Sequence, residues 1–194
     1  MISPIPVQRL GGSTRGAYLE HLSSLDAEDR RLRFGVPQSL AAVAAYVERI
    51  DFDSDVLFGV HGEALALCGV CHLALGSEFA ELGLSVLPKA RQQGIGGALM
   101  RRATEYARNR SIPRLHVQCL AENAAMIRLA RGLDMRVVVQ SGDADAHIML
   151  PSATPLSVTS EFIAERVALF DYALRTNVET WRRVGTAFAQ FSEI

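Results

Sequence analysis

A basic residue followed closely by glycines is the pattern in this chain that most clearly indicates chemistry. The segment reads Arg91-Gln92-Gln93-Gly94-Ile95-Gly96-Gly97. The first turn of a helix has backbone N–H groups without intrahelical partners and the positive end of the helix dipole, so it attracts anions. Glycines let a phosphate approach this backbone because they carry no Cβ. The segment therefore predicts a diphosphate-binding turn, with a plain strand-to-helix turn as the alternative.

Two familiar phosphate-binding loops fit this segment poorly. A Walker loop requires Gly-Lys followed by Ser or Thr, and no lysine follows Gly97. A dinucleotide-binding turn requires a third glycine and an acidic residue at the end of the next strand, whereas Ala98 and Leu99 follow Gly97. The first loop type is excluded and the second is weakly supported.

The glycine segment must connect a buried strand to an amphipathic helix. Alternate apolar positions predict the strand, which Pro88 ends: Ala80, Leu82, Leu84 and Val86. After the glycines, apolar residues recur at intervals of three and four: Ile95, Ala98, Leu99, Ala103, Tyr106 and Ala107. This spacing predicts a helix that begins near Gly94 and packs on a sheet.

In order and spacing, the segment resembles motif A of the GNAT superfamily of N-acyltransferases. Arg91, Gly94 and Gly96 match that motif, and the elements expected over residues 5–150 follow the family's order, β-α-α-β-β-β-α-β-α-β-β. The resemblance implies an α/β (α+β) fold, with a mixed, mostly antiparallel sheet flanked by helices. Residues 1–150 would form this acyl-CoA-binding acetyltransferase domain. Acetyl-CoA (coenzyme A) would be the co-substrate, and a primary amine would attack it directly in a ternary complex.

The resemblance also assigns the residues that would hold the coenzyme. The diphosphate would be bound by Arg91, Gln92, Gln93, Gly94, Gly96 and Gly97. The pantetheine arm would be held by the main chain of Leu84 and Val86 and by Asn123, and a backbone N–H near Val86 would polarise the thioester carbonyl. An ordinary helix cap is the alternative role for Asn123.

Glu81 is the candidate general base. An amine must be neutral to attack a thioester, and at pH 7 a lysine-like amine with a pKa near 10.4 is neutral only about once in 2,500 molecules. Glu81 lies on the opposite strand face from Ala80 and Leu82. Phe79-Ala80-Glu81 resembles the segment in which histone-acetylating members of the superfamily carry their general-base glutamate. A solvated or salt-bridged carboxylate is the alternative.

One feature of the family is missing from the chain. Many members have a tyrosine seven residues after the asparagine, which protonates the departing thiolate, and Gly-Phe eleven and twelve residues after it. The chain has Ala130, Asp134 and Met135 there. The thiolate would leave as the anion, or take a proton from water or another group. Because this tyrosine is missing, a second function stays possible: a catalytically silent acyl-CoA-binding or protein-interaction module.

The composition permits this function without requiring it. A chain of 194 residues, 49% of them hydrophobic, can bury one substantial core. A formal net charge of -1 provides no global basic field for nucleic acid or an anionic membrane, so the Arg30, Arg31 and Arg33 cluster is expected on a solvated helix face. The start of the chain lacks a signal-peptide pattern, and no apolar run reaches the roughly 18 residues of a spanning helix. A cytoplasmic location is therefore expected.

The sequence Cys68-Gly69-Val70-Cys71-His72 matches the C-x-x-C-H pattern of covalent haem attachment. It lies in an apparent buried strand, where residues three apart point to opposite faces. The two sulfurs could not then converge on a porphyrin or a metal. We expect neither haem nor a metal here, and expect both cysteines to be small buried side chains.

A helical extension is expected over residues 156–194, after a linker from Pro151 to Pro155. Its apolar residues recur by three or four: Ile163, Val167, Phe170, Leu174, Val178, Trp181, Val184 and Phe188. Thirty helical residues would reach about 45 Å, too long to be buried on a small domain without a bend near Thr176-Asn177. We therefore expect an arm that forms a homodimer, with a helix folded over its own sheet as the alternative. The acceptor is expected to be a small-molecule or peptide amine.

Overall fold

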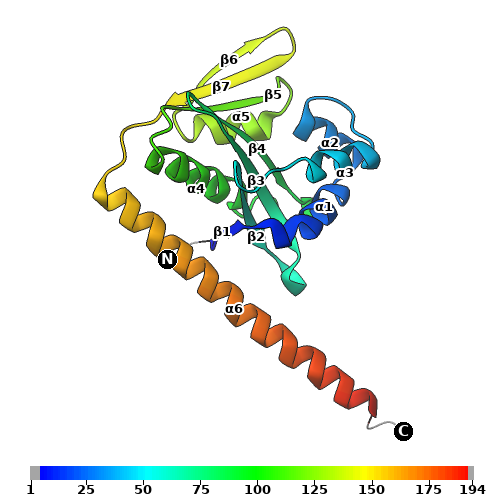
Figure 1. Cartoon of the computed structure of the whole chain (residues 1–194). Helices are drawn as coiled ribbons and strands as arrows, with labels where there is room; N and C mark the ends of the chain where they lie inside the picture. The colour runs from blue at the N-terminus through cyan, green and yellow to red at the C-terminus, as the bar shows by residue number, and fades with distance from the viewer. Residues whose placement is uncertain (1–4, 192–194) are drawn as a thin grey trace.

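A seven-stranded sheet forms the centre of the protein (Figure 1). The computed structural model describes residues 5–191, with side chains described as far as residue 178. The sheet has the order β1-β2-β3-β4-β5-β7-β6, and its neighbouring strands are antiparallel except for the parallel pair β4 and β5. The strands are β1 Gln8–Leu10, β2 Asp55–His61, β3 Leu67–Leu75, β4 Ala80–Val86, β5 Arg114–Leu120, β6 Arg136–Gln140 and β7 Asp143–Met149. The expected mixed, mostly antiparallel sheet is confirmed.

Helices cover both faces of the sheet (Figure 1). The helices are α1 Arg15–Ser23, α2 Ala27–Phe34, α3 Leu40–Glu48, α4 Ile95–Asn109, α5 Ala124–Arg131 and α6 Pro155–Phe191, with 3-10 turns η1 Gly12–Thr14, η2 Glu63–Leu65 and η3 Pro88–Ala90. One buried core contains the apolar residues of α4 and α5 and includes Ala80 and Leu82 of β4. A second core, on the opposite face, contains residues of α1 and α3. Burial of these two faces is the main favourable contribution to folding.

Side-chain caps determine where three helices begin. Asp26, Ser39 and Asn123 accept hydrogen bonds from the amides of Asp29, Ala42 and Met126, at 2.7, 3.1 and 3.1 Å. Each bond satisfies one of the amides that a helix start leaves unpaired. The cap that was the alternative role for Asn123 is therefore present.

Strands β4 and β5 pair over only two positions and then diverge. The paired residues are Ala80 with Leu115 and Glu81 with His116. The amide of Leu87 donates to Cys68 O, on the β3 side, at 2.8 Å. Because main-chain groups alternate sides along a strand, the amides of Leu84 and Val86 face the opening toward β5. The divergence therefore leaves a short strand edge available to a ligand.

Helix α6 is continuous from Pro155 to Phe191, without the bend near Thr176-Asn177 that burial of the whole helix on this domain would require. Its first turns are held by the buried Glu161, which pairs with Arg102 of α4 at 3.4 Å and with Arg110, the residue after α4, at 2.7 Å. The helix then extends past the body of the protein (Figure 1). Trp181, Val184 and Phe188 lie outside the residues whose side chains are described. Within residues 5–191, no helix has both the length and the hydropathy needed to cross a membrane.

Candidate active site

A cavity of about 520 Å³ lies between α2, the end of β4 and the first turns of α4 and α5. All the residues expected to bind the coenzyme line it except Gln93: Leu84, Val86, Arg91, Gln92, Gly94, Gly96, Gly97 and Asn123. Gln93 is exposed, and its side-chain amide donates to Lys89 O at 3.1 Å. The fold therefore brings the phosphate segment, the open edge of β4 and the start of α5 to one cavity.

The glycine segment has the backbone geometry of an anion site. Gly94 is the residue before α4 and has φ 81°, a conformation that favours glycine, and no side chain caps this helix. The first helical hydrogen bond runs from the amide of Ala98 to Gly94 O, at 3.0 Å. The three preceding amides have no acceptor within the helix. A Cβ at Gly96 would lie 3.0 Å from Leu129 Cδ1, so a side chain there would narrow the cavity. These features fit a diphosphate.

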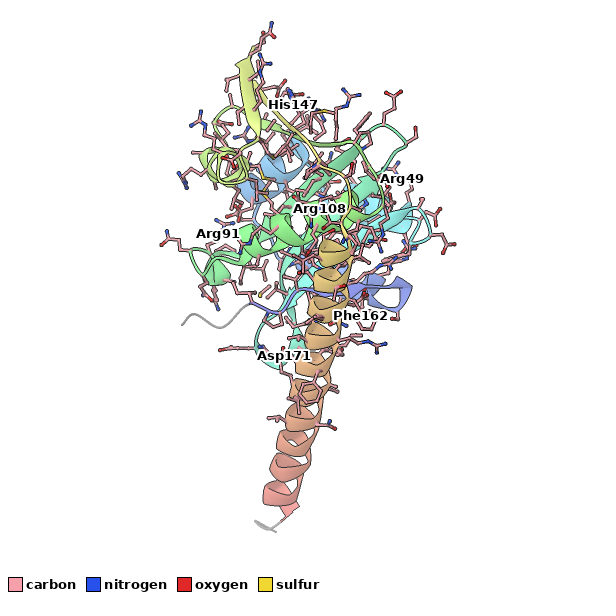
Figure 2. The ribbon with its side chains drawn as sticks, turned by 90° about the vertical axis from the view of Figure 1, so that its left-hand side faces the viewer. Arg49, Arg91, Arg108, His147, Phe162 and Asp171 are labelled. Carbon is pink, nitrogen blue, oxygen red and sulfur yellow. The ribbon has the colours of Figure 1, made fainter. Side chains whose placement is uncertain are left out.

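A carboxylate from α2 reaches the same end of the cavity. Arg91, just before α4 in Figure 2, donates from Nε to Val86 O at 3.1 Å. One of its terminal nitrogens lies 2.5 Å from Oδ2 of Asp29, whose side chain is only 13% exposed. Asp29 thus neutralises Arg91, the residue that the sequence predicts to bind the diphosphate.

We expect Asp29→Asn to strengthen coenzyme A binding by about 3- to 10-fold, which corresponds to about 0.7 to 1.4 kcal/mol. The substitution frees Arg91 and removes a negative charge that would repel the diphosphate. Isothermal titration calorimetry with coenzyme A measures the change, which should shrink at high salt. Glu28→Gln, on the same helix but 59% exposed and paired with Arg31, is the matched control. Weaker binding in Asp29→Asn would show instead that Asp29 usefully orients Arg91.

Ser85 and His21 form a buried polar pair at the cavity wall. His21 Nδ1 lies 2.9 Å from Leu67 O, and Nε2 lies 2.9 Å from Ser85 Oγ. Because a carbonyl only accepts, Nδ1 carries the proton and Nε2 accepts the hydroxyl proton of Ser85. Burial lowers the pKa of His21, and the hydrogen bond to Leu67 O only partly opposes this effect. Oγ of Ser85 thus keeps its lone pairs for a ligand in the cavity.

Arg33 also lines the cavity, so its expected place on a solvated helix face is wrong. Its Nη2 donates to the hydroxyl of Tyr46 at 3.2 Å. Its guanidinium lies against Gly83, where an added Cβ would be 2.4 Å from Nη1. Arg31, in contrast, pairs with Glu28 and Glu122 on the surface, as expected. A glycine in the interior of a strand is the one sequence signal that indicates this close approach.

Glu81 lies beside the cavity but not in its wall. Its side chain is exposed and on the same face of β4 as Gly83 and Ser85. Its neighbour on β5 is His116, whose Nε2 lies 2.6 Å from Asp145 Oδ2. Glu81 is therefore at the edge of an exposed polar cluster where β4 and β5 diverge, and its role as the base stays a prediction.

The remaining candidates have simple structural environments. Ala130, at the position of the family's tyrosine, is 1% exposed within α5. The cysteines are free thiols, and burial raises the pKa of Cys71 to about 12. Within the described part of the chain, no three His, Cys, Asp or Glu side chains are grouped as metal ligands. Cys71 and Cys119 are buried, whereas Cys68, which was expected to be buried, is partly exposed.

Comparisons with known proteins agree with this architecture. The model of the family described as "Acetyltransferase (GNAT) family" matches residues 25–135. Among curated proteins, none matches the chain significantly.

Three solved structures illustrate the likeness of fold. The GNAT domain of S. lividans PAT is 18% identical, with a TM-score of 0.64, over 74% of this chain and 89% of that one. The ribosomal-protein-S18-alanine N-acetyltransferase from Escherichia coli is 16% identical, with a TM-score of 0.59, over 77% and 96%. The spermidine N-acetyltransferase from Vibrio cholerae, in complex with CoA and spermine, is 15% identical, with a TM-score of 0.59, over 76% and 96%.

Proposed function

The chain belongs to the GNAT acetyltransferase family, and from this premise we propose that it transfers an acetyl group from acetyl-CoA directly to a primary amine in a ternary complex. The observation that supports this function most strongly is the cavity at the divergence of β4 and β5. It joins an uncapped helix start to a strand edge with free amides. The helix start suits a diphosphate, and the strand edge suits an extended arm that ends in a thioester.

In this proposal the coenzyme is held mainly by the backbone. The first-turn amides of α4 and the side chain of Arg91 bind the diphosphate, and Arg128 of α5 lines the same cavity. The main chain of Leu84 and Val86 binds the pantetheine arm along the open edge of β4. Acetyl-CoA supplies an acyl group that is activated as a thioester. An amide near Val86 is oriented before reaction to stabilise negative charge on the carbonyl oxygen.

Two polar side chains on β4 would act on the amine. The hydroxyl of Ser85 donates a hydrogen bond to His21. Its oxygen can therefore accept a hydrogen bond from an amine in the cavity and orient that amine for attack. Glu81, four residues earlier on the same face, is the proposed base. Its carboxylate is exposed and lies outside the cavity wall, so it would take the proton through water.

A silent acyl-CoA-binding module is the second candidate, because Ala130 replaces the tyrosine that protonates the thiolate in many members. The two functions differ in the release of free thiol from acetyl-CoA across a panel of amines, with calorimetric binding of coenzyme A as the control. We expect binding, and thiol release that depends on the amine. Binding without release for every amine would support the silent module, and absence of binding would exclude both.

We also propose that α6 pairs with a second copy of this chain. Its exposed apolar side chains follow a spacing of four, three and four residues, which is typical of paired helices: Ile163, Val167, Phe170 and Leu174. Phe170 is 67% exposed, and the helix continues beyond the body of the protein, which leaves room for a partner helix. An apolar row of this length is unusual on a monomer.

Phe170→Glu is expected to weaken self-association at least about 10-fold, because pairing would then bury an uncompensated carboxylate. Sedimentation velocity over a concentration series measures the effect. Ser160→Glu adds the same charge at an exposed polar position of the same helix and is the control. A wild-type protein that stays monomeric at high concentration would contradict the pairing.

A further inference from the structure

The guanidinium of Arg33 is a half-buried cation at the cavity wall whose interacting groups are phenols and not carboxylates. We infer that it binds a carboxylate on the acceptor, and that the acceptor is therefore a small amino acid with its amine and carboxylate close together. The inference rests on the proposed acetyl transfer and specifies its substrate class.

Among the residues whose side chains are described, no carboxylate forms an ion pair with Arg33. Nη2 donates to Tyr46, and the guanidinium lies 5.0 Å from the centre of the Phe34 ring. Burial raises the pKa of Tyr18, so this neighbouring phenol is neutral. Nε is buried and has no hydrogen-bond partner among the described residues. A buried charged donor without a partner is costly, so the groups around Arg33 leave part of its hydrogen-bonding capacity unused.

Asp55 is connected to Arg33 only through His72 and Tyr46, so its carboxylate is not the ion-pair partner of Arg33. Tyr46 is hydrogen-bonded to Nδ1 of His72 at 2.5 Å, and Nε2 of His72 lies 3.6 Å from Oδ1 of Asp55. Asp55 therefore interacts with His72, and Tyr46 separates His72 from Arg33. The arrangement supports the position of Arg33 without cancelling its charge.

Strand β4 is built to accept this guanidinium. A glycine in a strand interior weakens the strand, yet Gly83 occupies the middle of β4. Its Cα leaves the space that Arg33 fills, since a Cβ would be 2.4 Å from both terminal nitrogens. The guanidinium is a planar fork with paired donors, a geometry that matches a carboxylate. The guanidinium therefore occupies the space beside Gly83, and Arg33 is among the residues that line the cavity.

The distance from this cation to the reacting region limits the acceptor. Gly83 precedes Leu84 and is two residues from Ser85, and a strand rises about 3.3 Å per residue. The carboxylate subsite and the proposed amine subsite are thus separated by roughly 3 to 7 Å. This range matches α-, β- and γ-amino acids. A polyamine would place a second cation near Arg33 and be repelled.

The test compares amino acids with their carboxamides, which keep the amine and the size but lose the negative charge. Acceptors are the L-amino acids, β-alanine and 4-aminobutyrate, each paired with its carboxamide, and thiol release from acetyl-CoA is measured. For the best acceptor, we expect wild type to prefer the carboxylate by about 10- to 100-fold in kcat/KM, as lost charge-assisted hydrogen bonds would produce. In Arg33→Gln, kcat/KM should fall for the amino acid but not for its carboxamide, so the preference is lost. Arg33→Lys should retain part of the preference.

Arg31→Gln, a surface change on the same helix, is the matched control and should keep the preference. Unchanged coenzyme A affinity in Arg33→Gln shows that the variant is folded. Equal rates for acid and carboxamide, or an equal loss on both in Arg33→Gln, would overturn the inference while leaving acetyl transfer intact.

If no amine releases thiol, acetyl transfer fails and the subsite is tested by binding alone. N-acetylglycine and N-acetylglycinamide are then titrated in the presence of coenzyme A. Selective binding of the acid that depends on Arg33 supports the carboxylate subsite. Absence of that selectivity refutes it.

Discussion

Gly96→Asp is expected to weaken coenzyme A binding by at least about 100-fold, or about 2.7 kcal/mol. Gly96 is the second residue of α4 and lines the cavity, where the amides of the first turn have no helical acceptor. A carboxylate there would compete with the diphosphate for these amides and repel it. The side chain would also approach Leu129, since a Cβ alone lies 3.0 Å from Leu129 Cδ1. Calorimetry with coenzyme A measures the loss.

Gly16→Asp is a closely matched control for this experiment. Gly16 is likewise the second residue of its helix, α1, and an added Cβ would meet nothing within 4 Å. Aspartate is favourable in a first helical turn, so both variants should fold and keep similar unfolding temperatures. Retained affinity in Gly96→Asp would mean that the diphosphate binds elsewhere, and the proposed site would be wrong.

Glu81→Gln is expected to slow acetylation of a high-pKa alkylamine by about 10² to 10⁴ in kcat, the usual contribution of a general base. Glutamine keeps the size of the side chain but cannot take a proton. An α-amino group of a peptide, with a pKa near 7.7 to 8, is neutral far more often and should be slowed less. Steady-state rates for both amines, measured from low to high pH, test this difference. Coenzyme A affinity should not change, because Glu81 lies outside the cavity wall.

Two further variants identify where the proton goes. Glu78→Gln removes a carboxylate that is 79% exposed, shortly before β4, and should leave the rate unchanged. Ser85→Ala removes the hydroxyl that bonds to His21 at the cavity wall. Normal rates in Glu81→Gln together with a large loss in Ser85→Ala would reject Glu81 and assign proton transfer to the Ser85 and His21 pair.

The elements that carry the proposed coenzyme site could be predicted because their signals are local. The three- and four-residue spacing of α4 correctly indicates its buried face, and alternation along β4 does so for Ala80 and Leu82, whereas Leu84 and Val86 are only partly buried. The positive φ of Gly94 was not predicted, because a residue before a helix is usually extended. Periodicity and backbone preference operate over a few residues, so they can be read before any long-range contact is known. The resemblance to the family then supplied the order of the strands.

The proposed acceptor site could not be predicted, because its residues meet only through the tertiary fold. Ser85 and His21 are 64 residues apart, and the sequence contains no local pattern that connects them. Arg31 and Arg33 are two residues apart on one helix and look alike in the sequence, yet α2 directs one to solvent and the other to Gly83. Residues two apart lie on different sides of a helix, so the packing of α2 on β4 decides which of them enters the cavity.

The proposed diphosphate site and the buried faces of its flanking elements thus follow from residue order, because backbone geometry and hydrophobic spacing act between near neighbours. The pairing of Asp29 with Arg91 and the unneutralised charge of Arg33 were decided by packing. Burial and charge neutralisation depend on every segment that surrounds a group, and those segments are brought together only when the sheet and its two layers of helices have assembled.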